Sequence, residues 1–361
     1  MKKKVLLLLN GNQNGEIIRY REMLTEYDIV GVILPSGLGF SGKDCCCLDG
    51  GLETGIAVSA TVDYNQDIDG IIIDDKTSDV AAFEAIKEYV CDIIAHNVQI
   101  YFLYQPTDEI RELCFSRKAV FSVISDDNTG KIINERISEI QTPIVLVCGL
   151  HEYTHKFSIQ LEIYKQALEM GYKPLIIGSK AFTGCFSGFS VPRFMFSEIS
   201  EREKILSFNK YVKEIEKEHN PDLLVIGVPG GIAPFNEHFP GYFGITMYEI
   251  MQSITPDAII LSCLYENYNK EYFEELRKKF FYTYGVDIDC FNLSPFYVDV
   301  NESEQSGHIC YAKMNIDEVE RIKVQAANDI PLYNISNGSD GCIMSKSILE
   351  TLSDYSDAEI V

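Results

Sequence analysis

Short apolar runs alternate with segments of helical periodicity along almost the whole chain, and this alternation constrains the fold more than any other feature. Such an order is typical of parallel sheets covered by helices. In the first part of the sequence, Glu16–Thr25 is predicted to be a helix. Phe83, Ile86, Val90 and Ile94 recur at helical spacing after a cap at Thr77 or Ser78. The predicted strands are Val5–Leu9, Ile29–Leu34, Ile71–Ile73 and Val98–Leu103.

The second part repeats this pattern. His155–Met170 is predicted to be a helix with a broad apolar face. Ser200 and Glu203 form a capping box for a helix that ends before Pro221. The predicted strands are Ile144–Cys148, Leu175–Gly178, Leu223–Val228 and Ala258–Leu261. A chain of 361 residues is long enough for about two domains. We therefore predict an α/β protein with a Rossmann-like domain in residues 1–138 and a second parallel-sheet domain in residues 139–361.

The charge of the chain excludes some classes of partner. Its formal net charge is −23, so its surface should repel nucleic-acid backbones and anionic lipid. The same charge would attract a basic peptide, although solubility alone also explains it. The apolar run Val5–Leu9 is too short for a signal peptide, and no stretch reaches the length of a membrane span. A cytoplasmic protein is expected.

Eleven cysteines are expected as free thiols, and Cys148, Cys263 and Cys290 fall in or beside apolar strand-like runs. No pair has the CxxC spacing of zinc or iron–sulfur sites, so no metal is predicted. The adjacent residues 45–47 are all cysteine, and we favour an oxidation-prone loop there over a metal or redox site.

The first turn, Asn10–Gly15, does not predict a dinucleotide site. A dinucleotide fingerprint needs three glycines at fixed spacing, and this turn has two at a different spacing. NAD is therefore not expected as a cofactor.

The most informative stretch is CGLHEYTHKFSIQL, which begins at Cys148. A phosphate-binding loop needs a buried strand, a tight turn with inward amides, a lysine and a helix-opening hydroxyl residue. The longer spacing between Gly149 and Lys156 resembles the dethiobiotin-synthetase-like branch of P-loop enzymes, which implies a divergent P-loop NTPase-like domain in residues 139–361. An ordinary strand–loop–helix with a surface lysine fits this spacing as well. The candidate ligand-binding residues are Gly149, Tyr153, Thr154, His155, Lys156, Phe157 and Ser158.

Three departures from the common motif weaken a magnesium site. His155 replaces the glycine before the lysine, which predicts a strained or rearranged turn. Phe157 takes the place of the hydroxyl residue that usually holds magnesium, leaving Ser158 as the nearest substitute. Gly227 stands where the same branch has an acidic residue, and Glu152 or Glu237 could compensate. Efficient ATP hydrolysis is not expected.

Two loops rich in glycine and aromatic residues follow predicted strands. The loop from Pro229 to Gly244 should face the Gly149 loop, because ligands bind at this end of doubly wound sheets. The loop Ala181–Met195 offers an anion contact, although core packing of its phenylalanines explains it equally well. The predicted substrate rim is formed by Pro229, Gly230, Gly231, Glu237, His238 and Arg193.

Three segments carry a resemblance to the peptide maturation system family. They are GLHEYTHKFSIQLEIYKQALEMGYKPLIIGSK, FSGFSVPRFMF and PDLLVIGVPGGIAPFNEHFPGYFGI, which span most of the second domain. Members are encoded beside radical SAM enzymes that modify ribosomally made peptides in anaerobes. The resemblance implies natural product biosynthesis, with a precursor peptide and a radical SAM maturase as partners. More distantly, both halves resemble proteins that join a Rossmann-like domain to a dethiobiotin-synthetase-like P-loop domain, some of which are N-acyltransferases.

Three functional hypotheses follow. The first is an accessory protein of peptide maturation that binds a nucleotide or another phosphorylated ligand, such as ATP or GTP with Mg²⁺, at a degenerate P-loop. The second is a non-catalytic peptide-binding scaffold that kept the fold. The third is an enzyme resembling the N-acyltransferases. The sequence assigns no catalytic residue, and a homo-oligomer stands as an alternative to a monomer.

Overall fold

The computed structural model describes residues 2–10, 15–37, 39–74, 80–124, 136–241, 243–327 and 329–357. The chain forms two compact units. The first contains residues 1–126 and also residues 180–190, and the second contains residues 127–179 and 191–361. The sequence predicts the boundary between the two domains after residue 138.

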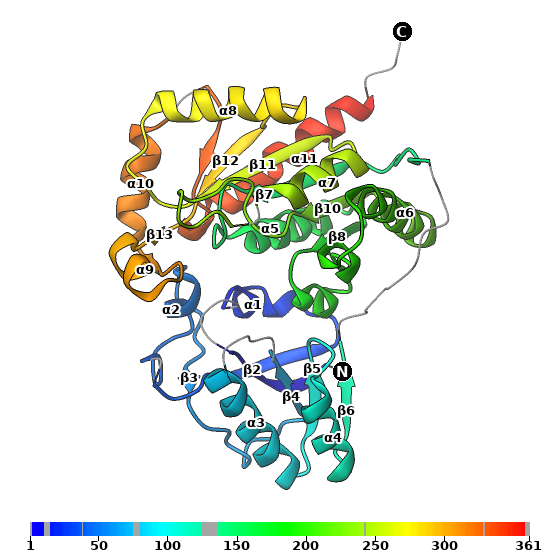
Figure 1. The fold of residues 1–361 in the computed structure, drawn as a ribbon, viewed down its shortest axis with the longest axis vertical. Coiled ribbons are helices and arrows are strands. Elements are labelled where there is room, and N and C mark those ends of the chain that lie inside the picture. Colours follow the sequence, from blue (N-terminus) through cyan, green and yellow to red (C-terminus); the bar gives the residue numbers. More distant parts are fainter. Residues whose placement is uncertain are drawn as a thin grey trace. The chain divides into compact units, whose positions relative to one another are not determined.

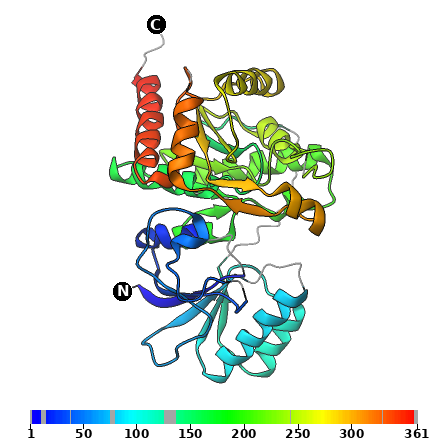
Figure 2. The same ribbon diagram turned by 90° about the vertical axis from the view of Figure 1, so that its left-hand side faces the viewer.

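The first unit is built on a parallel sheet with the strand order β3-β2-β1-β4-β5-β6. The chain moves from β1 to β2 in one direction and from β1 through β4 and β5 to β6 in the other. Right-handed crossovers therefore put α1 on one face and α3 and α4, which lie side by side, on the other (Figures 1 and 2). Its elements are β1 (Lys3–Leu8), α1 (Glu16–Arg19), η1 (Arg21–Met23), β2 (Tyr27–Ile33), α2 (Cys46–Asp49), β3 (Val58–Ser59), β4 (Gly70–Ile73), α3 (Val80–Ala95), β5 (Gln99–Phe102), α4 (Asp108–Ser116), β6 (Phe121–Val123), η2 (Ala181–Phe186) and β9 (Phe189–Ser190).

The predicted helix Glu16–Thr25 is wrong as one element. It is divided into α1 and η1, because Tyr20 leaves the helical conformation with φ −105° and ψ 15°. Arg21 donates from its side chain to the carbonyls of Ile18 and Thr54, at 2.9 and 3.2 Å, and so ties the interruption to a neighbouring loop. The predicted cap at Thr77 or Ser78 lies outside the described residues.

The second unit also contains a parallel sheet, in which β7 is an inner strand and the order is β15-β12-β11-β7-β10-β8. Helix α5 packs against α11, and α6 packs against α7. The Ser200–Glu203 capping box is confirmed at the start of α6. The elements are β7 (Ile144–Gly149), α5 (Lys156–Glu169), β8 (Pro174–Gly178), η3 (Arg193–Phe196), α6 (Glu201–His219), β10 (Leu223–Gly227), α7 (Ile245–Ser253), β11 (Ala258–Cys263), α8 (Lys270–Tyr284), β12 (Cys290–Leu293), β13 (Phe296–Val298), α9 (Val300–Ser306), β14 (Tyr311–Lys313), α10 (Ile316–Gln325), β15 (Leu332–Tyr333), η4 (Ile335–Asn337) and α11 (Asp340–Asp357).

The strand order fixes where a ligand site can form in the second unit. From β7 the chain runs past the position of β10 to β8, returns to β10, and then crosses to β11 on the other side of β7 (Figure 1). The order therefore reverses at β7, and the crevice at the carboxyl end of this strand is the place where open α/β sheets bind ligands. The predicted fold class, a Rossmann-like unit followed by a P-loop-like parallel-sheet unit, is confirmed.

The cysteines of the strands belong to the cores. Cys148, Cys263 and Cys290 are buried, as predicted. In the 45–47 triplet, Cys45 is buried, whereas Cys46 and Cys47 are half-buried. Burial raises the pKa of Cys45 and of Cys148 to about 12, so both stay protonated thiols at neutral pH. Among the helices of the described residues, none combines the length and the apolar character needed to span a membrane.

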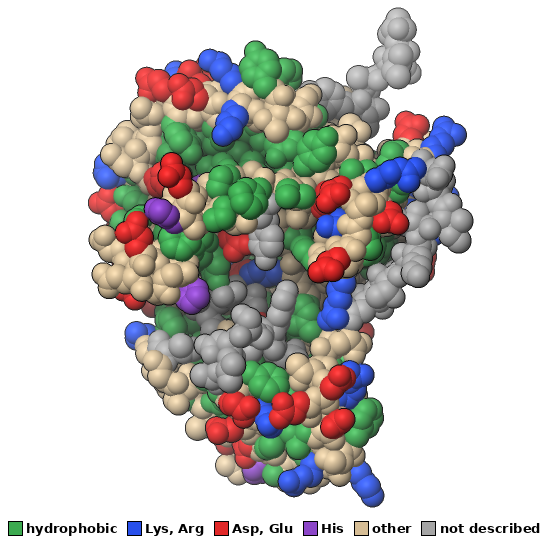
Figure 3. All heavy atoms as spheres, viewed as in Figure 1, with side chains coloured by type: hydrophobic (Ala, Val, Ile, Leu, Met, Phe, Trp, Pro, Cys, Tyr) green, Lys and Arg blue, Asp and Glu red, His purple; other side chains and the backbone are tan. Residues whose placement is uncertain are grey.

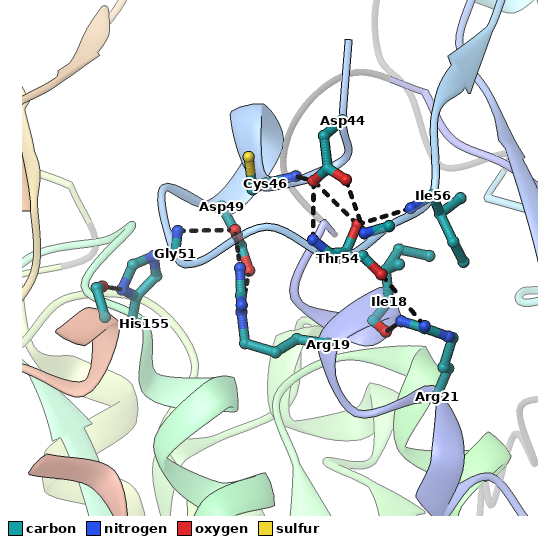
Figure 4. A network of polar contacts seen from close by, with 12 residues as sticks. Ile18, Arg19, Arg21, Asp44, Cys46, Asp49, Gly51, Thr54, Ile56 and His155 are labelled. Carbon is teal, nitrogen blue, oxygen red and sulfur yellow. Dashed lines mark hydrogen bonds and ion pairs between the residues drawn. The ribbon is translucent and has the colours of Figure 1, made fainter. Parts of the chain in front are cut away.

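A carboxylate holds the cysteine-bearing loop of the first unit in place. Asp44 accepts hydrogen bonds from the backbone N–H groups of Cys46 (2.7 Å), Thr54 (3.0 Å) and Gly55 (2.8 Å), and from the Thr54 hydroxyl (3.0 Å) (Figure 4). Burial disfavours the charged form of Asp44, but the hydrogen bonds from Cys46 and Thr54 outweigh it and hold its pKa well below the usual range. Asp44 is therefore an anchor of this loop.

Replacing Asp44 by Ala should lower the free energy of unfolding by about 2–3 kcal/mol, because several hydrogen bonds to a charged acceptor are lost together. The contribution of Asp44 is present above the unfolded-state pKa of about 4, and it is lost as the pH falls toward the lower folded-state pKa. Urea unfolding of the wild type and of Asp44→Ala between neutral and acid pH measures both effects. Asp67→Ala, which removes an exposed ion pair with Lys4, is the control. Equal losses in the two variants would contradict the anchoring role.

Candidate functional site

The segment Gly149–Ser158 connects the central strand β7 to helix α5, which is the position of a phosphate-binding loop. Lys156 is the first residue of α5, and His155 is its N-cap. Only 8% of the Lys156 surface is exposed. Lys156 is therefore not a surface lysine.

The backbone of this loop is strained at two residues without being glycine-rich. Tyr153 and His155 adopt left-handed conformations, with φ values of 58° and 61°, and Thr154 between them does not. The prediction of a strained turn at His155 is confirmed. Non-glycine residues in this region cost free energy and cluster at functional sites. Left-handed residues in a turn are one element of the anion-binding nests in which successive backbone N–H groups face one ligand.

Serine hydroxyls from neighbouring strands hold the carbonyl side of the loop. Ser294, which follows β12, donates to the carbonyl of Tyr153 at 3.2 Å, and Ser262 in β11 donates to the carbonyl of Thr154. Asn292 in β12 donates to the Ser262 hydroxyl at 2.8 Å. All three polar side chains are fully buried. This buried network, Ser262, Asn292 and Ser294, fixes the orientation of the two peptide groups.

Several backbone N–H groups of the loop, unlike its carbonyls, have no hydrogen-bond partner among the described residues. Within the described part of the chain, the backbone N–H groups of His151, Glu152 and Thr154 donate to no protein acceptor. The Nδ1 atom of His151 is also buried without a hydrogen-bond partner there. Polar groups left in this state beside a helix N-terminus call for a ligand or ordered water.

His151 is uncharged at neutral pH. Burial lowers the pKa of His151 to about 4, and the nearby charge of Lys156 acts in the same direction against the opposing effect of the Pro234 carbonyl. A neutral imidazole offers one donor and one acceptor. With its N–H turned to the Pro234 carbonyl, His151 keeps Nδ1 as an acceptor for a donor group of a ligand, and it does not repel the charge of Lys156.

Gly149 is required by a close approach of the loop to its own strand. A Cβ atom at this position would lie 2.4 Å from the Thr154 hydroxyl, 2.7 Å from the His151 carbonyl and 2.9 Å from Cδ of Lys156. The space directly above Gly149 is thus filled by Thr154 and by the stem of Lys156. A ligand would approach the loop at its N–H groups and at the tip of Lys156.

The loop after β10 faces the Gly149 loop, as predicted. Ile232 and Ala233 donate from their N–H groups to the carbonyls of Gly149 (3.0 Å) and Leu150 (3.1 Å). The Gly230 carbonyl accepts a hydrogen bond from Nζ of Lys156. This contact places one predicted rim residue directly at the predicted lysine.

The other predicted rim residues are distributed more widely. Pro229 and Gly231 flank Gly230 and are half-buried. Glu237 and His238 are exposed farther along the same loop, where the Asn236 side chain accepts from the N–H of His238. Arg193 is exposed on η3, shortly after Val191, whose N–H bonds to the carbonyl at the end of β8. Arg193 therefore stands near β8, which β10 separates from β7.

Aromatic side chains from β13 and β14 pack against the loop at Tyr153 and His155. The rings of Tyr153 and Tyr311 stack with centroids 4.0 Å apart, and Phe296 contacts the rings of Tyr153 and His155 edge-on. The antiparallel pair of β13 and β14 supplies Phe296 and Tyr311. Ser336 of η4 forms a 3.2 Å hydrogen bond with Nδ1 of His155. These contacts support the two strained residues from outside the sheet.

Sequence reasoning missed the polar residues that position the loop, namely Ser262, Asn292, Ser294 and Ser336. A signal existed for the first three, because each interrupts or ends an apolar strand run, in AIILSC and CFNLS. Buried polar residues in such runs need partners and often mark a site. Nothing in the local sequence shows that their partners would be the carbonyls of the loop.

No family model and no curated protein matches this chain. Solved structures do. The chain is similar in fold to a DUF1611 family protein from Anabaena variabilis ATCC 29413. The two share 12% sequence identity with a TM-score of 0.59, and the match covers 95% of this chain and 99% of that chain. At this low identity, the structural match shows a shared two-domain fold and no more.

Weaker similarities involve FtsY proteins. Chloroplast FtsY from Physcomitrella patens matches with 10% identity and a TM-score of 0.28, covering 60% of this chain and 67% of that chain. FtsY from Mycoplasma mycoides matches with 13% identity and a TM-score of 0.25, covering 60% and 75%. These TM-scores are too low to support any argument about this chain.

Replacing Asn292 by Ala should destabilise the protein by about 2–3 kcal/mol, because the Ser262 hydroxyl loses its donor and the Ile335 N–H loses its acceptor in a buried network. Asn267→Ala, at an exposed asparagine, is the matched control and should change stability by less than about 0.5 kcal/mol. Chemical unfolding of both variants measures the difference. A loss no larger than that of the control would show that the buried network does not support the loop.

Proposed function

We propose that this protein binds the phosphate group of a nucleotide or of another phosphorylated ligand at the Gly149–Ser158 loop, as an accessory protein in the maturation of a ribosomally synthesised peptide. The observation that carries the binding proposal is the set of N–H groups of His151, Glu152 and Thr154 that have no acceptor among the described residues, in a turn with two left-handed residues at the start of α5. Ser294 fixes the peptide group that carries the Thr154 N–H. Such a turn binds anions through its backbone.

The charges around the turn favour the same ligand. Helix α5 has 14 residues, and its N-terminus carries a partial positive charge from the helix dipole. The Lys156 ammonium group contacts the Gly230 carbonyl, and a phosphate oxygen would be a stronger, charge-assisted acceptor in its place. The loop is therefore a local anion site in a protein whose net charge is −23.

The site supports binding more directly than catalysis. His151 is a neutral hydrogen-bonding group, Lys156 pairs with phosphate, and Ser158 is buried on the first turn of α5. The peptide-maturation setting rests on the sequence resemblance alone. In that setting, ligand binding at the loop would act as a switch or as the first step of an assisting reaction.

A peptide-binding scaffold is the second candidate, and an apolar patch next to the rim favours it. Phe243, Ile245 and Tyr248 are 64%, 50% and 51% exposed. Ile245 and Tyr248 are three residues apart on α7 and so share one helix face. The net charge of −23 would attract a peptide that carries basic as well as apolar residues. Figure 3 shows acidic and basic side chains interspersed on one face. An N-acyltransferase remains the third alternative and would require acyl-CoA at the same loop.

The binding proposal is tested by thermal melting with ATP, GTP and an acyl-CoA, each with and without Mg²⁺. A ligand at about 100 times its Kd should stabilise the folded state by about 2.7 kcal/mol and raise the melting temperature by several degrees. Lys156→Met, which keeps the aliphatic stem but removes the charge, should lose most of this shift. Protection by the acyl-CoA alone would favour the third alternative.

Lys165→Met is the matched control, because Lys165 is an exposed lysine on the same helix. It should keep the full ligand-induced shift. The proposal fails if no ligand shifts the wild type, or if Lys156→Met and Lys165→Met respond alike. A scaffold would instead bind a precursor peptide in a salt-sensitive manner, and that binding would survive Lys156→Met.

A further inference from the structure

Gly227 ends β10, the strand paired with the central β7 beside the loop. The space that a side chain at position 227 would occupy is filled by a side chain from a neighbouring helix. A Cβ atom on Gly227 would lie 2.1 Å from Oε1 of Gln160, 2.5 Å from Cδ and 2.8 Å from Nε2. Gln160 of α5 therefore occupies the volume that any larger residue at position 227 would need.

Gln160 is held firmly in this position. It is fully buried, and its Nε2 donates to the carbonyls of Ile177 in β8 (3.2 Å) and Val225 in β10 (3.3 Å). The side chain thus bridges two adjacent strands and presents a neutral amide where a strand-end carboxylate would otherwise stand. The amide oxygen lies against Gly227 and has no hydrogen-bond partner among the described residues.

The donors that a phosphate loop uses for magnesium do not fit here. In P-loop NTPases the ion is held by a Ser or Thr directly after the lysine and by an Asp at the end of a neighbouring strand. In this chain Phe157 follows Lys156 and is buried, and Gly227 faces Gln160. The described residues also contain no group of three His, Cys, Asp or Glu side chains that could hold a metal ion.

We infer that this loop binds its phosphorylated ligand without a divalent cation, and that Gln160 is the specificity-determining residue that excludes the cation by filling the space at Gly227. The inference rests on the proposed function and goes beyond it. Lys156 and the loop amides would then neutralise the phosphate alone. The protein would favour ligands that carry their phosphate without bound Mg²⁺.

Calorimetric titration with inorganic pyrophosphate and with ATP tests this, once in excess EDTA and once in excess MgCl₂. Because ATP and pyrophosphate are almost entirely bound to Mg²⁺ in excess MgCl₂, the Kd of the wild type should be equal to or higher than its value in EDTA. A Kd at least about tenfold lower with Mg²⁺ would overturn the inference but leave the proposed function standing. Absence of binding in both conditions would instead remove the proposed function, and the inference with it.

The role of Gln160 is tested separately with a double variant. Gln160→Ala combined with Gly227→Asp opens the space and supplies a carboxylate, so its binding should become at least about tenfold tighter with Mg²⁺. Gln160→Ala alone is the control and should bind no more tightly with Mg²⁺ than without it. If the double variant binds no more tightly with Mg²⁺ than without it, Gln160 does not determine whether the site can use a divalent cation.

The packing itself gives a readout that needs no ligand. Gly227→Ala should lower the melting temperature in the wild-type background, because the new methyl group meets Gln160. In the Gln160→Ala background the same change should have little further effect. Equal losses in both backgrounds would contradict the claim that Gln160 occupies this space.

Discussion

The two hydrogen bonds from Ser294 and Ser262 to the carbonyls of Tyr153 and Thr154 are the interactions on which the site depends. A peptide group whose carbonyl is held on one side must present its N–H on the other, and the group that carries the Tyr153 carbonyl also carries the N–H of Thr154. The serines belong to the carboxyl ends of the sheet, so the rigid part of the fold sets the direction of the loop. The strain at Tyr153 and His155 persists because the surrounding contacts over-determine it.

Three residues suit this strand–loop–helix to anion binding without a metal ion. They are Gly149, Lys156 and Gln160. Because position 149 is glycine, the Thr154 side chain packs directly over the end of β7. A ligand therefore has access to the loop at its backbone N–H groups and not at the space above Gly149. Lys156 is buried at the start of α5, where its charge adds to the helix dipole. Gln160, one turn later on the same helix, replaces a carboxylate at the sheet by a neutral amide. The result is a positive site with little provision for a metal.

The apolar periodicity of the sequence predicted the strands and the fold class, because burial on both faces of a parallel sheet leaves a strong pattern. The capping box at Ser200 followed from local chemistry. The interruption at Tyr20 could not be predicted, since it depends on Arg21 bonding a distant loop. The sequence also contains no indication that residues 180–190 belong to the first unit, because long-range packing leaves no periodic pattern. Likewise, Gly227 showed that a carboxylate is missing, but only the structure showed that Gln160 takes its space.

The central claim is that the N–H groups of the loop bind an anion, and amide NMR chemical shifts test it most directly. Titration of the ¹⁵N-labelled protein with inorganic pyrophosphate should move the amide signals of His151, Glu152 and Thr154 first and furthest, and Lys156→Met should weaken the response. Signals of these three residues that stay in place while others move, or no saturable change at all, would contradict the account.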